Sequence, residues 1–268
     1  MKIVVAVKQV LDPDGVNSYA LWGRLEVDEN GRSFATGDAV PRIINAYDEQ
    51  AMEAAMRIRD AGVECTITAV SIGADSARDV LKRCIATGAD ASVLVTDEQQ
   101  ANGDGFRTAK LLAAVVEKIG GADLVLAGRQ GSDYDQGTVP GALAEYLDAS
   151  LVTMASDVAA GDGTVRVTQV TPAGEQVVEA TLPAVVSVSN EIGIPRYPTS
   201  RGMLSARRKP PDMHEAADLI DDEAASIEIV ELSVPDVQGH CEIIDGDSAE
   251  AKAGTLLETL QTSGVFHE

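Results

Sequence analysis

Residues 124–141 of the chain read LVLAGRQGSDYDQGTVPG. The apolar run at 124–127 predicts a strand that is buried on both faces. The following segment contains four glycines, which let main-chain N–H groups approach a ligand closely. Pro140 favours the first turn of a helix. Because ligands of open α/β sheets bind beyond the carboxyl ends of the strands, this stretch predicts both a fold class and a candidate site.

Strand-like and helix-like segments alternate on both sides of this stretch. Short apolar runs occur at 3–7, 66–70, 92–95 and 124–127. Segments with helical spacing lie between or after them, at 48–62, 76–86, 105–119 and 139–147. This alternation predicts an α/β fold with a doubly wound, mostly parallel Rossmann-like sheet and right-handed crossovers.

The pattern changes after residue 150. Residues 164–171 and 176–181 flank the turn Pro172-Ala173-Gly174 and predict an antiparallel hairpin, and 184–188 predicts another buried strand. A second hairpin is expected within 11–40, turning at 28–31. Residues 206–226 are interpreted as a linker, 227–232 as a short strand, and 248–262 as a final helix. We therefore expect an α/β domain at 1–205 and a C-terminal linker and arm at 206–268.

The charge of the chain excludes some partners. Asp and Glu number 43 against 21 Lys and Arg, a formal net charge of -22. Nucleic acid is a poor partner for such a surface, because phosphate backbones attract basic residues. The acidic residues are spread along the chain, which favours adaptation to high salt over simple solubilisation. No apolar run reaches the roughly 18–20 residues that span a bilayer, and we expect a cytoplasmic protein.

Signatures of catalysis and metal binding are missing from the sequence. It contains no GxGxxG after the first strand, no GxxxxGK[ST], no HExxH and no GxSxG. The three cysteines, at 65, 84 and 241, lie far apart, and the three histidines have no partner at a catalytic spacing. The sequence therefore assigns no catalytic residue and no metal ligand.

Two segments leave alternatives open on pattern alone. The glycine-rich stretch is either an anion site, formed by amides and a helix N-terminus with help from Arg129, or a plain surface loop. Asp133 and Asp135 oppose phosphate binding unless their side chains turn away to cap backbone donors. The cationic residues Arg201, Arg207, Arg208 and Lys209 are either a docking patch for an acidic partner or ordinary solubilising charge.

An ordered set of short segments resembles a known family. They are VAVKQV at 5–10, NAYD at 45–48, AVSIG at 69–73, ADLVLAGRQ at 122–130 with Asp133, Asp135 and Gly137, AEYL at 144–147, LPAVVS at 182–187 and PRYP at 195–198. Residues 246–265 are similar to the family's C-terminal helix. Taken together, these segments resemble the β subunits of electron transfer flavoproteins. Gln169 and Pro172 depart from the family's hairpin, where a basic and an acidic residue are usual.

The resemblance implies a heterodimer and an electron carrier, not a complete enzyme. The α subunit would carry most of an FAD site, and this β subunit would hold AMP or, in the electron-bifurcating branch, a second FAD. Thr96-Asp97 and Gly103-Asp104 are similar to a loop of that branch. The positions that match the nucleotide site are Ala6, Asn45, Ala46, Tyr47, Asp48, Ile72, Gly128, Arg129, Gln130, Gly131, Ser132, Asp133, Tyr134, Asp135, Gln136, Gly137, Thr138 and Val139.

The resemblance also implies partners. A dehydrogenase or a quinone oxidoreductase would dock near the PRYP-like segment, at Arg196, Ser200, Arg201, Met203 and Leu204. Ser200 stands where the family usually has a leucine anchor, so Met203 or Leu204 is the candidate replacement. The C-terminal helix would pack on the α subunit. The rival interpretations are a stand-alone ATP- or AMP-binding regulator of the universal-stress type and an ATP-using ligase or pyrophosphatase.

Overall fold

A computed structural model describes residues 1–13, 26–32, 40–97, 104–221, 227, 229–234 and 241–265. The chain divides into two compact units, Met1–Ser233 and Val234–Glu268. The first unit contains the sheet and the candidate site, and the described residues of the second contain one helix.

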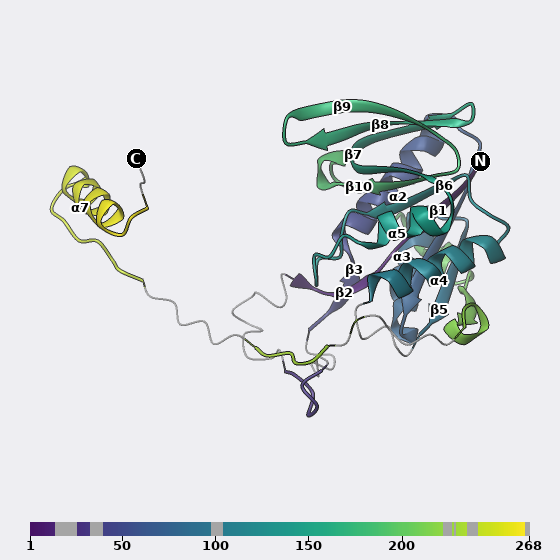
Figure 1. Ribbon diagram of the computed structural model, residues 1–268, viewed down its shortest axis with the longest axis horizontal. Coiled ribbons are helices and arrows are strands. Elements are labelled where there is room, and N and C mark those ends of the chain that lie inside the picture. Colours follow the sequence, from purple (N-terminus) through teal and green to yellow (C-terminus); the bar gives the residue numbers. More distant parts are fainter. Residues whose placement is uncertain are drawn as a thin grey trace. The chain divides into compact units, whose positions relative to one another are not determined.

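A nine-stranded sheet forms the centre of the first unit (Figure 1). Its strand order is β11-β5-β4-β1-β6-β10-β7-β8-β9. Neighbours from β11 to β7 pair in parallel, whereas β7, β8 and β9 pair antiparallel. The bounds are β1 Lys2–Ala6, β4 Thr66–Gly73, β5 Ala91–Thr96, β6 Leu124–Gly128, β7 Ser150–Gly161, β8 Thr164–Thr171, β9 Gly174–Thr181, β10 Ala184–Val188 and β11 Asp212–Glu215.

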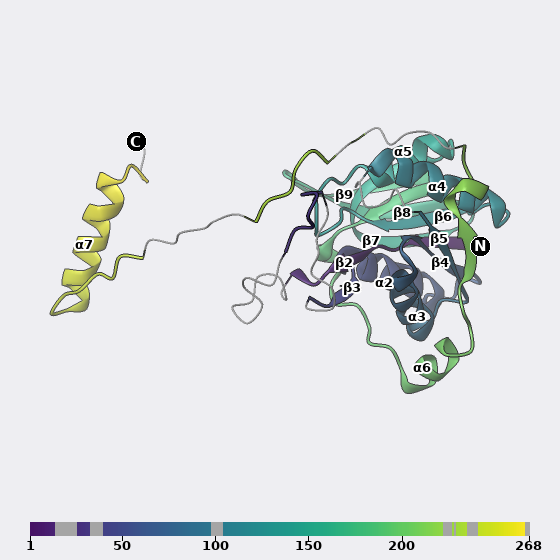
Figure 2. The same cartoon turned by 90° about the horizontal axis from the view of Figure 1, so that it is seen from below.

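Helices cover the parallel strands on both faces (Figure 2). Two of them, α2 (Ala46–Asp60) and α3 (Arg78–Thr87), pack on one face, while α4 (Gly105–Lys118) and α5 (Val139–Tyr146) pack on the other. Their apolar stripes and the alternate side chains of the strands form two separate cores. The doubly wound, Rossmann-like fold expected from the sequence is therefore confirmed.

The order in which the chain forms the sheet creates a crevice. From β1 the chain moves outward to β4 and β5, and it then crosses back through α4 to form β6 on the other side of β1. Such a reversal separates the connections that leave neighbouring strands, and it opens a cleft beyond their carboxyl ends. In this chain the cleft lies at the ends of β1 and β6.

The hairpin predicted around Pro172-Ala173-Gly174 is confirmed by β8 and β9. Gln169 and Gln176 lie directly opposite each other, and the side-chain amide of Gln176 donates a hydrogen bond of 2.7 Å to that of Gln169. An amide pair therefore links the two strands of the hairpin at this position. The strand β7 pairs with β10 through one half and with β8 through the other.

Several expectations for the irregular segments need correction. Residues 212–215, interpreted as linker, form β11 at the edge of the main sheet, in parallel register with β5. The described residues of 227–232 contain no strand. The expected turn at 28–31 exists, with the Gly31 N–H donating to the Asp28 carbonyl at 2.9 Å. Most of its flanks lie outside the described residues, and β2 (Gln9–Leu11) pairs antiparallel with β3 (Arg42–Ile44).

The second unit contains α7 (Ala249–Thr262), close to the predicted 248–262. The Ser248 hydroxyl caps its first turn by accepting the Ala251 N–H at 3.2 Å. None of its side chains is buried, and Leu256 and Leu257 are both exposed. Within the described residues, no helix combines the length and the hydropathy that crossing a membrane requires.

Candidate functional site

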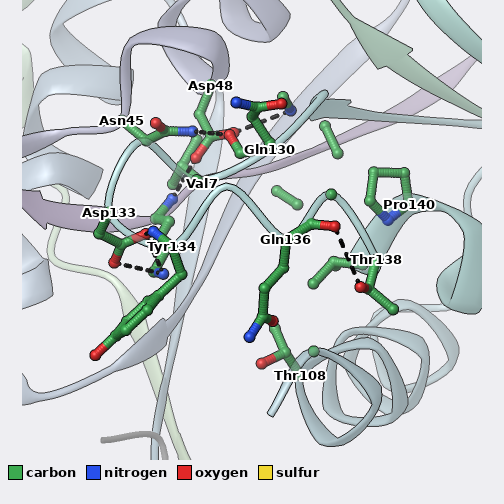
Figure 3. A pocket seen from close by; sticks show the side chains of 18 of the residues that line it. Val7, Asn45, Asp48, Thr108, Gln130, Asp133, Tyr134, Gln136, Thr138 and Pro140 are labelled. Carbon is green, nitrogen blue, oxygen red and sulfur yellow. Dashed lines mark hydrogen bonds and ion pairs between the residues drawn. The ribbon is translucent and has the colours of Figure 1, made fainter. Parts of the chain in front are cut away.

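A pocket lies at the carboxyl ends of β1, β4 and β6 (Figure 3), with a cavity volume of about 110 Å³. Fourteen of the residues predicted from the sequence line it. They are Ala6, Asn45, Asp48, Ile72, Gly128, Gln130, Gly131, Asp133, Tyr134, Asp135, Gln136, Gly137, Thr138 and Val139. The fold thus brings together residues that lie up to 133 positions apart in the chain, from Ala6 to Val139.

Four predicted residues do not line the pocket. Ala46 is exposed at the start of α2, and Ser132 donates its main-chain N–H to Asn45. The Arg129 guanidinium lies over the Tyr47 ring, 5.0 Å from its centroid, and its main-chain N–H donates to the Val188 carbonyl at 3.0 Å. Arg129 is therefore directed at an aromatic ring outside the pocket, where a cation is attracted by the π face.

Asn45 fixes the glycine-rich loop to the start of α2. Its side chain is almost fully buried, donates to the Gln130 carbonyl at 2.8 Å and accepts the Ser132 N–H at 3.1 Å. Asn45 precedes α2 at the N-cap position, yet its side chain makes no cap hydrogen bond. The amide group therefore serves the loop, which needs one donor and one acceptor from the same residue.

Asp48 joins the ends of two strands. One carboxylate oxygen accepts the Lys8 N–H at 2.7 Å, and the other accepts the Gly128 N–H at 2.9 Å. Burial raises the pKa of Asp48 to about 7, although these hydrogen bonds oppose the rise. Gly128 is needed here because a Cβ atom would lie 2.6 Å from the Tyr47 Cβ and 2.9 Å from the Tyr47 carbonyl carbon.

The aspartates of the loop turn toward partners within the protein. Asp133 pairs with the Lys8 ammonium at 2.6 Å and also accepts the Tyr134 N–H at 3.0 Å. Asp135 accepts from the Gln130 side chain at 2.6 Å. The Lys8 ammonium also lies 5.3 Å from the centroid of the Tyr134 ring. The sequence argument that these carboxylates oppose an anion is weakened, since each is engaged by a donor.

The backbone of the loop turns sharply before α5. Asp135 and Gly137 both have positive φ, 52° and 63°, and the Asp135 N–H donates to the Gly131 carbonyl at 2.9 Å. This conformation suits glycine, and Asp tolerates it better than most residues. The turn directs the chain from the loop into the first turn of α5, where Pro140 occupies an early position.

The sequence missed one wall of the pocket, which belongs to α4. Gly105, Thr108 and Leu112 line the pocket from this helix. A Cβ atom on Gly105 would lie 3.3 Å from the Thr138 Cβ, so the helix start packs closely on the loop before α5. The sequence marks only where this helix begins, at Asp104, whose side chain caps α4 by accepting two main-chain N–H groups, at 2.9 and 3.1 Å.

A buried ion pair fixes α4 against β5. The Arg107 guanidinium binds both carboxylate oxygens of Asp97, at 2.9 and 3.1 Å, and both side chains are at least nine-tenths buried. Asp97 belongs to the segment that resembles the bifurcating branch, whereas Gly103 lies outside the described residues. The pair places α4 and its pocket residues at a fixed distance from the sheet.

The pocket has an apolar end and a polar end. Ala6, Val7, Ile72 and Ala127, at the ends of the strands, line one part of it together with Leu112 of α4. The glycine-bearing loop and the start of α5 line the other, where the first turn of a helix leaves N–H groups without intrahelical partners. Such a pocket suits a ligand with a flat apolar ring and an anionic group. Among the described residues, no cluster of three or more His, Cys, Asp or Glu side chains could hold a metal ion.

The residues predicted for docking lie away from the pocket. Ser200, Arg201, Met203 and Leu204 are exposed on α6 (Ser200–Ala206). Arg196 differs from them, because its guanidinium binds Glu53 at 2.7 Å and Asp60 at 2.8 Å. These two carboxylates occupy Arg196, so its position supports a role inside this chain more than a direct contact with a partner.

Comparisons with known proteins show the family to which the chain belongs. A family model described as the Electron transfer flavoprotein domain matches residues 36–219. Subunit CarD of the caffeyl-CoA reductase-Etf complex of Acetobacterium woodii is 30% identical over 272 residues, which cover 99% of this chain and 100% of the relative. Electron transfer flavoprotein subunit beta of Megasphaera elsdenii is 32% identical over 83% of this chain and 81% of the relative. The corresponding subunit of Syntrophomonas wolfei is 31% identical over 98% and 97%.

Proposed function

Because the chain belongs to the electron transfer flavoprotein family, we propose that it is the β subunit of a heterodimeric electron carrier that holds an adenine nucleotide in this pocket. The α subunit would carry most of an FAD site. FAD supplies the chemistry by accepting and donating electrons, and the protein sets its position and surroundings. The chain itself would act as a carrier subunit and not as an enzyme.

The observation that supports this proposal most directly is the position of the glycine-bearing loop beside the sheet crevice. The phosphate of the nucleotide would meet main-chain amides of the loop and the start of α5. The adenine would lie against the apolar end, between the ends of β1 and β4 and the side chain of Leu112 on α4.

The charge of the pocket lining makes the main-chain amides important for binding a phosphate. The amine and carboxyl side chains that line the pocket are Lys8, Asp48, Asp133 and Asp135, so carboxylates outnumber cations. Lys8 is already paired with Asp133. A phosphate therefore depends on N–H donors and the helix dipole rather than on an unpaired cation.

The nucleotide is AMP or a second FAD. The similarity to CarD, which belongs to a caffeyl-CoA reductase-Etf complex, keeps the second FAD in the proposal. The similarity to a subunit named simply as electron transfer flavoprotein subunit beta, over 98% of this chain, keeps AMP in the proposal equally. In either case Asn45, Asp48 and the loop would hold the adenylate part, which the two ligands share.

The same proposal covers the partners. The exposed face of α6 would dock a dehydrogenase or a quinone oxidoreductase, and α7 would pack on the α subunit. The exposed leucines of α7 support the second contact, since a helix with an uncovered apolar side gains stability by burying it against another protein. The net charge of -22 supports a working environment of high salt.

The test is to co-express the chain with the α subunit, purify the heterodimer, denature it and quantify the released nucleotides. One FAD and one AMP per heterodimer indicate simple electron transfer, and two FAD indicate the bifurcating type. A preparation without adenylate in this subunit would refute the proposed site. A stable monomer with bound ATP and no affinity for the α subunit would instead support the universal-stress interpretation.

A further inference from the structure

A buried carboxylate on α2 binds the segment that leads into α6. Glu53 is 5% exposed, and one of its oxygens accepts both the Arg196 main-chain N–H at 3.1 Å and the Arg196 Nε at 2.7 Å. The other oxygen accepts the Arg196 Nη2 at 3.1 Å and the Arg57 Nε at 3.1 Å. Glu53 thus fixes both the backbone and the side chain of a single residue of this segment.

Further contacts hold the two ends of the segment. Before Arg196, the Arg57 guanidinium donates to the Ile192 carbonyl at 2.8 Å. After Arg196, α6 packs closely on the last turn of α3, where a Cβ atom on Gly202 would lie 2.9 Å from the Ala86 carbonyl carbon and even closer to its oxygen. Residues 193–204, which we name the docking segment, are therefore attached to α2 and α3 at defined points.

The docking segment presents apolar side chains to solvent. Ile194 is 85% exposed and Tyr197 is 82% exposed, while Met203 and Leu204 are 52% and 59% exposed. Exposed apolar residues that gather in one short segment mark an interaction surface. Arg201 lies within the segment, and Arg207 and Arg208 follow two residues after its end, all exposed. On a chain with a net charge of -22, this local positive charge fits a partner with carboxylates around an apolar hollow.

We propose that Glu53 is a positioning residue for electron transfer, because it holds Arg196 and thereby fixes the direction in which Ile194 and Tyr197 meet the redox partner. This proposal rests on the proposed function of the chain. Ile194 and Tyr197 flank Pro195 and Arg196 directly. A change in the backbone conformation at Arg196 would therefore redirect both exposed side chains. Glu53 itself would touch neither the partner nor a cofactor.

The chemistry of the pair supports positioning over simple packing. Replacing a buried ion pair with apolar residues of similar volume often leaves stability unchanged or improves it, so packing alone does not require a carboxylate here. A bidentate pair with an arginine adds geometric definition. Burial alone would raise the pKa of Glu53, but the hydrogen bonds from Arg196 and Arg57 outweigh it and lower this pKa, so the carboxylate stays ionised. The bond to Glu53 likewise raises the pKa of Arg196.

The experiment uses the full heterodimer with Glu53→Gln and Glu53→Ala, and Asp79→Asn as the control. Asp79 is an exposed carboxylate that pairs with Lys82 on α3, so its neutralisation removes the same charge without touching the docking segment. Hydrogen exchange, read by mass spectrometry, reports on residues 193–199. We expect exchange there to become about tenfold faster in Glu53→Gln and faster still in Glu53→Ala, because the Arg196 N–H loses its acceptor. The control should match the wild type.

The second readout is electron transfer with a dehydrogenase that reduces the wild-type heterodimer. We expect Glu53→Gln to raise the KM for the heterodimer about fivefold with little change in kcat, because docking geometry governs the encounter. Dye reduction after photochemical reduction of the flavin should be unchanged. Glu53→Gln, Arg196→Gln and the double variant form a double-mutant cycle. The effects of the two single substitutions on the KM should not add in the double variant.

Three outcomes would overturn the proposal. Unchanged exchange at 193–199 would mean that Glu53 does not restrain the segment. Additive effects of Glu53→Gln and Arg196→Gln would mean that Arg196 contacts the partner directly. A loss of dye reduction would place Glu53 near the flavin. A heterodimer that holds FAD in its α subunit but no adenylate in this subunit would refute the proposed nucleotide site, yet the exchange and the cycle would still decide the role of Glu53.

Discussion

Gly128→Ala tests the contact on which the candidate site depends. Gly128 ends β6, and its N–H donates to Asp48 at the start of α2. Its φ is not in the left-handed region, so alanine can adopt the backbone conformation, and the effect reports on space alone. The new methyl group would lie 2.6 Å from the Tyr47 Cβ, a separation that real Cβ atoms essentially never show. The start of α2 must therefore move away from β6.

The size of the effect follows from two terms. Overpacking of a close contact costs about 1–3 kcal/mol. Above pH 7, where Asp48 is ionised, loss of the hydrogen bond to this charged acceptor costs about 1.5–3 kcal/mol. These two costs overlap, because moving α2 away from β6 relieves the close contact but stretches the hydrogen bond. We therefore expect the free energy of unfolding to decrease by about 3 kcal/mol in total. For a domain of this size each kcal/mol lowers the Tm by about 2–4 °C, which gives a decrease of about 6–12 °C.

The assay is thermal unfolding of the purified heterodimer together with its nucleotide content. Gly141→Ala is the matched control, because a Cβ at Gly141 in α5 would meet only the Leu151 Cδ2 at 4.0 Å. Alanine within a helix should stabilise the control slightly. We expect Gly128→Ala to lose most of its nucleotide, because Asn45 and Asp48 move with α2. A Gly128→Ala heterodimer with the wild-type Tm and full nucleotide would refute the reasoning.

Three further predictions follow from the site and the charge. Asn45→Ala should weaken nucleotide binding at least about tenfold, because the Gln130 carbonyl and the Ser132 N–H lose their buried partner. Calorimetric titration measures the affinity, and the control Asn190→Ala, at an exposed position, should bind the nucleotide normally. Burial raises the pKa of Asp48 to about 7, so the folded chain holds this proton more tightly than the unfolded chain, and the contribution of Asp48 to the free energy of unfolding decreases as pH rises from about 4 to about 7. Urea unfolding across that pH range should show a smaller decrease in the free energy of unfolding for Asp48→Asn than for the wild type. Equal dependence on pH in the two proteins would contradict the raised pKa of Asp48. The Tm should rise with KCl, since the Debye length shortens from about 10 Å at 0.1 M to about 3 Å at 1 M and screens the repulsion among the acidic residues; a flat or falling Tm would argue against adaptation to high salt.

The regular part of the fold could be predicted because local pattern and tertiary environment agree. The apolar runs at 3–7, 66–70, 92–95 and 124–127 are strands, since a strand buried on both faces needs an unbroken apolar run. The helices between them follow from their apolar spacing. The edge strand β11 was missed because only one strand pairs with it, so residues 212–215 are mostly polar and carry no strand pattern.

The candidate site likewise has one part that the sequence predicts and one part that it does not. Its loop could be found because close backbone approach requires glycine, and Gly128 and Gly137 leave that mark in the sequence. The wall of the pocket that α4 forms could not be predicted, because nothing in residues 105–112 specifies which strands the helix crosses. That follows from the return of the chain from β5 to β6 across β4 and β1.

The sequence by itself determined the fold class, the glycine-rich loop and the family. The tertiary structure decided the partners of individual side chains. Arg129, a candidate phosphate ligand by its place in the loop, lies over Tyr47, and Arg196, a candidate docking residue, is bound by Glu53 and Asp60. The reason is physical. Backbone conformation and burial depend on residue type and spacing along the chain, whereas the direction of a long charged side chain depends on which opposite charge or ring the fold places within its reach.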